Sequence, residues 1–277
     1  MPLVVLTGAT RGIGKAAAIE LASRGAEIAS VGRDHERVAE TVVEARAAGG
    51  SGAVHEHVAD LASMADVRTL ATELLESHPR IDVLANNAGA LFTSRHVTLD
   101  GFEQTFALNH LAPFLLTELL LERLKESGGR VVTTSSDAHR SARLDLDDLQ
   151  FTERRFNAPR VYGTSKLCNI LFTRELQRRV PEINANCFHP GVIRTGFGKN
   201  DGALAKISLT AIGPFLKSPK KGARSLVELA LDPQGGELRG AYLEKRKVAD
   251  PSEPGRDDEL AAALWARSQD LVAAPVA

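Results

Sequence analysis

The chain has 277 residues, of which 43% are hydrophobic and 25% charged, so it can bury a large core in one or two soluble domains. Its formal net charge of −1 gives no reason to expect a nucleic-acid partner or binding to an acidic membrane surface. Cys168 and Cys187 are the two cysteines and lack the spacing of metal ligands, so we expect no metal site. The sequence starts with no signal peptide and has no apolar run of ~18 residues. We therefore expect a cytoplasmic protein without a membrane anchor.

A glycine-rich turn lies between the first predicted strand, residues 3–6, and the first predicted helix. The helical pattern covers residues 15–23, and the helix is expected to begin near Gly12. The turn has the spacing Gly8-x-x-x-Gly12-x-Gly14, whereas the common dinucleotide-binding turn has Gly-x-Gly-x-x-Gly. Glycine lets a ligand approach the main chain, and the free amides and positive dipole end of a helix start attract phosphate. The turn is therefore either a phosphate site or a plain tight turn of an α/β protein.

Strands and helices alternate along the rest of the chain. Further strands are predicted at residues 27–31, 53–59, 81–85, 130–135, 184–188 and 240–243. Further helices are predicted at residues 35–48, 63–77 with Ser63 as N-cap, 100–125, 159–180, 220–231 and 257–271, and a polar loop at residues 245–255. This alternation predicts an α/β (Rossmann) fold: one doubly wound domain over residues 1–277, with about seven parallel strands and helices on both faces.

Several residues that could contact a ligand stand where predicted strands end. Ligands of doubly wound folds bind beyond the carboxyl ends of the strands, so these residues should line one edge of the sheet. They are Gly8, Arg33, Asp60, Asn87, Ser136 and Pro190.

Tyr162 and Lys166 are four residues apart on the predicted helix 159–180 and therefore share one face of it. A lysine ammonium near the phenol should lower the pKa of Tyr162, which would let this side chain act as an acid or base near neutral pH. The alternative is a solvated surface pair. Asn109 favours the catalytic interpretation, because it stands among core residues of the predicted helix 100–125, where a buried amide needs hydrogen-bond partners.

Taken together, these motifs resemble the short-chain dehydrogenase/reductase family over nearly the whole chain. The matching residues, in chain order, are Thr7-Gly8-x-x-x-Gly12-Ile13-Gly14, Asp60-Leu61, Asn86-Asn87-Ala88-Gly89, Asn109, Ser136, Tyr162-x-x-x-Lys166 and Pro190-Gly191 followed by Thr195. Within the family, the sequence is similar to the retinol-dehydrogenase-like branch. That similarity rests on Asn109-His110-Leu111, Ser135-Ser136-x-Ala138-His139, residues 162–172 and His189-Pro190-Gly191-Val192-x-Arg194-Thr195.

The resemblance implies catalytic roles for four residues. Tyr162 would donate a proton during carbonyl reduction and accept one during alcohol oxidation. Lys166 would lower the pKa of Tyr162 and hold the nicotinamide ribose. Ser136 would hydrogen-bond the substrate oxygen as charge develops there, with Ser135 as the alternative serine. Asn109 would hold a water molecule in a proton relay behind Lys166.

The resemblance also implies a nicotinamide cofactor. Its expected binding residues are Gly8, Thr10, Arg11, Gly12, Ile13, Gly14, Arg33, Asp60, Leu61, Asn87, Ala88, Gly89, Tyr162, Lys166, Pro190, Gly191, Ile193 and Thr195. Among them, Thr195 would bind the carboxamide and Asn87 the adjacent ribose region. Asp60 would hydrogen-bond the adenine amino group, and its alternative use is to cap the following helix.

The end of the second predicted strand bears on the choice between NAD and NADP. An acid there would bind the ribose hydroxyls of NAD, whereas an arginine accommodates the 2′-phosphate of NADP. Gly32 stands at the position expected for the acid, and Arg33 and Arg11 lie on the same side. We therefore predict NADP(H) over NAD(H). Asp34 is the alternative ribose acid, unless it caps the next helix.

Apolar residues near the predicted active edge are candidates for a substrate wall and for a lid over residues 197–218, and core or subunit packing would use them equally well. They are Ala90, Leu91, Phe92, Val192, Ile193, Phe197, Leu204, Ile207, Leu209, Ile212 and Phe215. His139, close to Ser136 in sequence, either contacts the substrate or plays a structural role.

We therefore predict NADP(H)-dependent interconversion of an apolar ketone or aldehyde and its alcohol. The alternatives are an NAD-dependent alcohol dehydrogenase of the same fold and a non-catalytic NADP-binding regulator. The resemblance further implies a homodimer or homotetramer.

Overall fold

The computed structural model describes residues 1–49, 52–191 and 218–273. They form an eight-stranded sheet in the order β3-β2-β1-β4-β5-β6-β7-β8. The strands are β1 (Leu3–Thr7), β2 (Glu27–Gly32), β3 (Val54–Val58), β4 (Val83–Asn86), β5 (Arg130–Thr134), β6 (Asn184–His189), β7 (Tyr242–Glu244) and β8 (Lys247–Val248). Because β1 pairs in parallel with both β2 and β4, the chain winds outwards to either side of β1. The predicted α/β Rossmann fold is confirmed, and the ligand crevice of such a fold lies where the strand order reverses.

The last strand, β8, lies within residues 245–255, which were expected to be a loop. It pairs antiparallel with β7 across a turn in which Lys245 and Arg246 have φ angles of 51° and 68°. Both residues of β8 are exposed, so the sequence carries no alternating pattern that could predict the strand.

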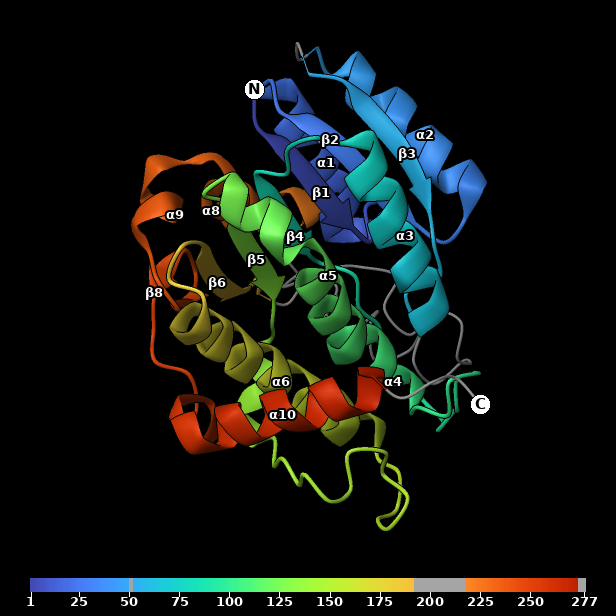
Figure 1. The fold of residues 1–277 in the computed structure, drawn as a ribbon, viewed down its shortest axis with the longest axis vertical. Helices are drawn as coiled ribbons and strands as arrows, with labels where there is room; N and C mark the ends of the chain where they lie inside the picture. The colour runs from blue at the N-terminus through green and yellow to red at the C-terminus, as the bar shows by residue number, and fades with distance from the viewer. Residues whose placement is uncertain (50–51, 192–217, 274–277) are drawn as a thin grey trace.

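Helices cover both faces of the sheet, and each face has its own apolar core (Figure 1). One face carries α1 (Gly12–Ser23), α2 (His35–Ala47) and α8 (Pro219–Leu231). The other carries α3 (Met64–Ser77), α5 (Ala112–Glu126) and α6 (Ala158–Arg179). The terminal helix α10 (Asp258–Ala273) crosses α6 on the outside, and the short α9 (Pro233–Glu237) follows α8.

The predicted helix 100–125 is wrong in its first part. Helix α4 (Gln104–Phe106) begins after Glu103, whose Oε2 accepts the Phe106 N–H at 2.8 Å. A π-helical turn, η1 (Ala107–Leu111), then joins α4 to α5 and carries Asn109. Pro113 explains the wide turn, because it has no N–H to donate to the Asn109 carbonyl four residues earlier.

Ser63 caps α3 as predicted, since its Oγ accepts the Asp66 N–H at 3.2 Å. Within the described residues, no helix combines the length and apolar character needed to cross a bilayer. The interpretation of residues 1–277 as one domain stays a prediction. The predicted lid lies outside the described residues, apart from Ser218.

Candidate active site

The glycine-rich turn packs directly against the end of β4. Gly8 has a φ of 66°, and a Cβ there would lie 2.8 Å from the Ala88 Cα. A Cβ at Gly14 would overlap the Gly8 carbonyl oxygen and lie 2.7 Å from Asn87 Nδ2. Both glycines are therefore required by the close approach of two backbones, and the turn leads into the first amides of α1 at Gly12.

Asn87 holds this turn in place. Its Nδ2 donates to the Thr7 carbonyl at 3.0 Å and to the Gly8 carbonyl at 3.3 Å. The Thr7 hydroxyl in turn accepts the backbone N–H groups of Asn87 and Ala88 at 3.0 and 3.1 Å. The predicted cofactor residues Gly8, Asn87 and Ala88 thus form one hydrogen-bonded unit. Thr7 belongs to the glycine-rich motif in the sequence, and its hydroxyl supports this unit through contacts that sequence spacing does not predict.

A side chain at position 32, at the end of β2, would require the Thr10 side chain to move. A Cβ on Gly32 would overlap Thr10 Cγ2 and would lie 3.0 Å from Val38 Cγ2. Asp34, the alternative ribose acid, caps α2 by accepting the Arg37 N–H at 3.3 Å, and it pairs with the Arg37 guanidinium at 3.2 Å. The alternative that Asp34 is a helix cap is therefore confirmed.

Arg11 and Arg33 are exposed near this strand end. Neither side chain forms a hydrogen bond or ion pair with another described residue. We call Arg11, Gly32 and Arg33 the Arg33 edge.

Asp60 follows β3 and is exposed. Its Oδ1 accepts the Ala62 N–H at 3.0 Å, whereas Ser63, not Asp60, caps α3. Leu61 is buried beside it. At the far side, Pro190 and Gly191 follow β6, while Ile193 and Thr195 lie outside the described residues, as do most of the proposed substrate-wall residues.

Lys166 is 2% exposed and its Nζ donates to the Thr134 carbonyl at 3.1 Å. Asn169 Nδ2 donates to the same carbonyl at 3.2 Å. The Lys166 ammonium lies 5.6 Å from the centroid of the Tyr162 ring. A Cβ on Gly89 would lie 3.1 Å from Lys166 Nζ, so the backbone after β4 passes directly over the lysine. Neither the Thr134 carbonyl nor Asn169 was predicted, because no sequence spacing marks a backbone acceptor.

The two serines after β5 have different surroundings. Ser135 is buried and its Oγ donates to the Lys166 backbone carbonyl at 2.8 Å, so it supports α6. Ser136 is partly exposed and hydrogen-bonds the Tyr162 phenol. The structure therefore brings Ser136, and not Ser135, to Tyr162.

Burial raises the pKa of Tyr162 to about 12, and the Ser136 hydrogen bond offsets this only in part. Burial also lowers the pKa of Lys166 to about 8. The predicted lowering of the Tyr162 pKa is thus wrong for the protein by itself. The physical reason is that the ammonium donates to Thr134 rather than to the phenol, so desolvation dominates.

Asn109 is fully buried and uses its whole side chain in binding the protein. Its Nδ2 donates to the Ala90 carbonyl and to Ser165 Oγ, both at 2.9 Å, and its Oδ1 accepts the Ala90 N–H at 2.9 Å. Both amide hydrogens are therefore occupied, so a water in the predicted relay would have to bind a carbonyl oxygen of Asn109. We call Asn109, Ser136, Tyr162 and Lys166 the Tyr162 cluster.

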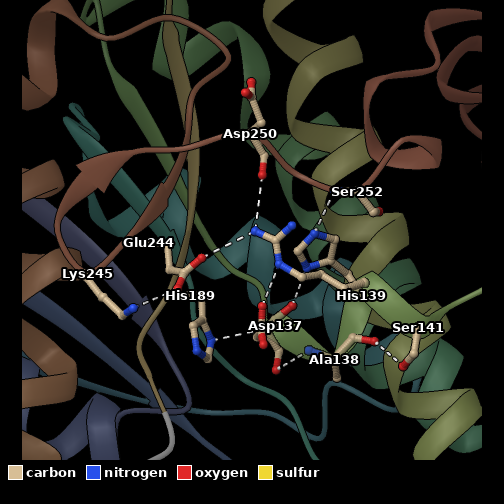
Figure 2. A network of polar contacts seen from close by, with 11 residues as sticks. Asp137, Ala138, His139, Ser141, His189, Glu244, Lys245, Asp250 and Ser252 are labelled. Carbon is tan, nitrogen blue, oxygen red and sulfur yellow. Dashed lines mark hydrogen bonds and ion pairs between the residues drawn. The ribbon is translucent and has the colours of Figure 1, made fainter.

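A polar network surrounds the short 3₁₀ helix η2 (Asp137–Ser141) that follows Ser136 (Figure 2). His139 is buried, its Nδ1 donates to the Ser136 carbonyl at 2.6 Å, and its Nε2 accepts the Ser252 N–H at 3.0 Å. Both ring nitrogens are therefore occupied within the protein. Of the two roles considered for His139, the structural one is confirmed.

Comparisons with known proteins identify the family of the chain. Residues 2–204 match the short chain dehydrogenase family. A Streptomyces sp. (strain C5) protein, provisionally named daunorubicin C-13 ketoreductase DnrU, is 45% identical over 269 aligned positions, covering 97% of this chain and 92% of that protein. Retinol dehydrogenase 13 of Homo sapiens is 39% identical over 277 positions, covering 97% of this chain and 84% of that protein. The solved Pseudomonas aeruginosa RhlG/NADP active-site complex has a TM-score of 0.70 and 27% identity, covering 87% of this chain and 93% of that chain.

The match extends over more than half of the chain, and the relatives at 45% and 39% identity span nearly all of it. The resemblance inferred from the motifs is therefore confirmed. This chain belongs to the short chain dehydrogenase family, in its retinol-dehydrogenase-like branch, and is an oxidoreductase of alcohol and carbonyl groups.

Proposed function

We propose that this protein uses NADP(H) to interconvert a neutral, apolar ketone or aldehyde and its alcohol, with Tyr162 as the acid and base. A homodimer or homotetramer and a cytoplasmic location stay predictions.

The choice of NADP(H) over NAD(H) depends mainly on the crowding of position 32 by the Thr10 side chain. An NAD-binding acid at the end of β2 would need a Cβ where Thr10 Cγ2 already lies. Asp34 does not replace it, since its carboxylate caps α2 and pairs with Arg37. The exposed guanidinium groups of Arg11 and Arg33 instead offer planar donors suited to a 2′-phosphate. The name of the Pseudomonas aeruginosa RhlG/NADP complex supports the same choice.

The residues of the Tyr162 cluster fit the remaining chemistry. The nicotinamide, when bound, supplies or accepts the hydride. A Tyr162 pKa near 12 keeps the phenol protonated at neutral pH, ready to give its proton to a carbonyl oxygen. Ser136 reaches Tyr162, so both hydroxyls can donate to one substrate oxygen as negative charge develops there. With a pKa near 8, Lys166 is mainly an ammonium at pH 7 and would hold the ribose hydroxyls.

An apolar substrate is supported by the segment after Gly89. Ala90, Leu91 and Phe92 are all partly exposed, and Asn109 fixes the Ala90 backbone through two hydrogen bonds. These side chains therefore offer apolar surface close to the Tyr162 cluster. Of the two relatives, one is named as a ketoreductase and the other as a retinol dehydrogenase, so the names cover a ketone and an alcohol as substrates.

The test measures kcat/KM with NADPH and with NADH against a panel of neutral apolar ketones and aldehydes. We expect turnover with at least a tenfold preference for NADPH. Arg33→Ala should weaken NADPH binding about 10- to 100-fold, since charge-assisted hydrogen bonds contribute about 1.5–3 kcal/mol, with little effect on NADH. Arg80→Ala is the matched control, because Arg80 is an exposed arginine that pairs with Asp82 just before β4.

Three outcomes would contradict the proposal. A wild-type preference for NADH would favour the NAD-dependent alternative, and an equal loss for both cofactors in Arg33→Ala would remove the charge argument. Tight NADPH binding without turnover of any substrate in the panel would favour the non-catalytic regulator.

A further inference from the structure

A second cluster of titratable side chains begins at the first residue of β2 and continues along the neighbouring strand β3. Glu27 is the first residue of β2, and His55 and His57 lie on one side of β3, the edge strand beside α3 (Figure 1). His78 stands at the C-terminus of α3. Strands rise ~3.3 Å per residue, so Glu27 is about 17 Å from Gly32 along β2. His55 pairs with Ala29 of β2, so Glu27 and His55 lie towards the other end of these strands from Gly32, whereas His57 pairs with Val31, next to Gly32.

Three of these side chains converge on one point. A potential ligand atom from each of Glu27, His55 and His78 lies within 4.8 Å of the other two. His55 Nε2 is 2.7 Å from Glu27 Oε1, and the His55 and His78 ring centroids are 4.9 Å apart. The three side chains come from β2, β3 and α3, so a bound ion would connect three elements.

His57 packs beside this group. Its Nε2 lies 3.4 Å from His78 Nε2, but its nitrogens are not among the ligand atoms of Glu27, His55 and His78 that lie within 4.8 Å of one another. On its other side, His57 Nδ1 faces the Glu73 carboxylate at 3.7 Å. His57 therefore supports His78 from the side and is not counted as a ligand.

The two histidines next to each other in this cluster are enclosed by the protein. His57 and His78 are 8% and 3% exposed. On the same face of the sheet as His55 and His57, the neighbouring strand β2 carries the apolar residues Ala29 and Val31. If packing were the only requirement at these positions of β3, apolar side chains would meet it without burying polar groups.

We propose that Glu27, His55 and His78 bind a divalent first-row transition-metal ion through one carboxylate oxygen and two imidazole nitrogens, with His57 packed beside His78. Imidazole ligands suit zinc, nickel and copper, whereas magnesium and calcium prefer oxygen ligands throughout. The ion would join the edge strand β3 to β2 and to α3, whose C-terminal dipole end also favours a cation. Its expected effect is on stability and not on turnover.

The test titrates the EDTA-treated full chain with zinc chloride and follows thermal unfolding, with zinc stoichiometry from a chromophoric chelator. We expect one zinc ion per chain and a rise in Tm of roughly 5 °C at a free zinc concentration about 100-fold above Kd. Magnesium chloride should leave Tm unchanged. Glu27→Gln and His55→Asn should each weaken zinc binding at least tenfold. His35→Ala, which removes an exposed histidine on α2, should leave it unchanged.

Glu27 and His55 are chosen for substitution because their side chains are 33% and 40% exposed, so their variants should fold. Cobalt(II) gives a second measurement that does not depend on stability: tetrahedral visible absorption bands in the wild type that disappear in Glu27→Gln. Absence of bound zinc, or equal zinc affinity in wild type, Glu27→Gln and His55→Asn, would overturn the proposal. Cobalt bands that persist unchanged in Glu27→Gln would overturn it as well.

Discussion

The Tyr162 cluster and the Arg33 edge lie at the same edge of one sheet but are built in opposite ways. In the Tyr162 cluster, Lys166 and Asn109 are buried, and their polar groups are bound to named backbone and side-chain partners. At the Arg33 edge, Arg11 and Arg33 are exposed and bind no other described side chain.

The difference follows from what each region would have to do. Proton and hydride transfer need groups fixed before the substrate arrives, so the protein pays the desolvation cost of a buried lysine. A phosphate brings its own charge and can gather flexible guanidinium groups when it binds. Rigidity is therefore concentrated where chemistry is proposed, and the proposed selectivity for NADP(H) depends on the crowding of a side chain at Gly32 by Thr10.

Removal of the Tyr162 hydroxyl should have the largest effect on the Tyr162 cluster. Tyr162→Phe leaves the ring in place but removes the proposed proton donor, so kcat should fall about 10²- to 10⁴-fold. NADPH binding should persist, because the Arg33 edge is unaffected. Steady-state kinetics and NADPH fluorescence titration measure the two effects separately.

Tyr242→Phe is the matched control, because Tyr242 is the other tyrosine, and its buried hydroxyl has no hydrogen-bond partner among the described residues. It should retain full activity. A Tyr162→Phe variant within tenfold of wild-type kcat would remove Tyr162 from the proposed acid/base role.

Replacement of Lys166 should show how much its buried charge lowers the free energy of unfolding. Burial lowers the pKa of Lys166 from 10.5 to about 8, and at about 1.4 kcal/mol per pKa unit the buried charge costs about 3 kcal/mol. Below pH 8 the lysine is protonated in both the folded and unfolded states, so the cost is present in full. Between pH 8 and about 10.5 the folded state loses its proton first, so stability increases with pH.

Lys166→Met should therefore raise the free energy of unfolding at pH 7 by up to about 3 kcal/mol and flatten its rise above pH 8. Asn169 still donates to the Thr134 carbonyl, so that acceptor is not left unpaired. Urea unfolding at pH 7 and pH 9.5 measures both effects, with the exposed Lys220→Met as control. A destabilised Lys166→Met, or an unchanged pH dependence, would contradict this account.

The sequence predicted most helices and strands correctly, because the spacing of apolar residues and the positions of glycines are local properties of the chain. The rule that ligands bind beyond the strand ends predicts that Gly8, Arg33, Asn87 and Ser136 lie at one edge of the sheet, and each of them follows the end of a strand in that sheet. The π-helical turn at Asn109 was not predicted, although Pro113 was visible, because a proline near a helix start usually fits the α form.

Other features depend on contacts between distant residues. Ser135 and Ser136 are adjacent and chemically identical, and they differ in their partners on α6: Ser135 donates to the Lys166 carbonyl, and Ser136 hydrogen-bonds the Tyr162 phenol. The pKa of Tyr162 is raised because the phenol is buried and the Lys166 ammonium donates to the Thr134 carbonyl instead. Neither the burial nor the direction of the ammonium follows from a spacing of four residues. The same holds for the histidines of β3, because the approach of His55 to Glu27 and His78 depends on the pairing of β2 with β3 and on the position of α3.

The smallest expected effect is that of Gly32→Asp, which tests whether Thr10 excludes a side chain at position 32. Gly32→Asp alone should lose about 1–3 kcal/mol of stability, because the new Cβ overlaps Thr10 Cγ2, and it should gain little affinity for NADH. Thr10→Ser removes that methyl group, so the double variant Thr10→Ser/Gly32→Asp should recover stability and place a carboxylate at the end of β2. NADH affinity should then rise and NADPH affinity fall, because the carboxylate binds ribose hydroxyls and repels a 2′-phosphate. Thr10→Ser alone provides the control, and a single Gly32→Asp variant that is fully stable and prefers NADH would show that Thr10 does not exclude the acid.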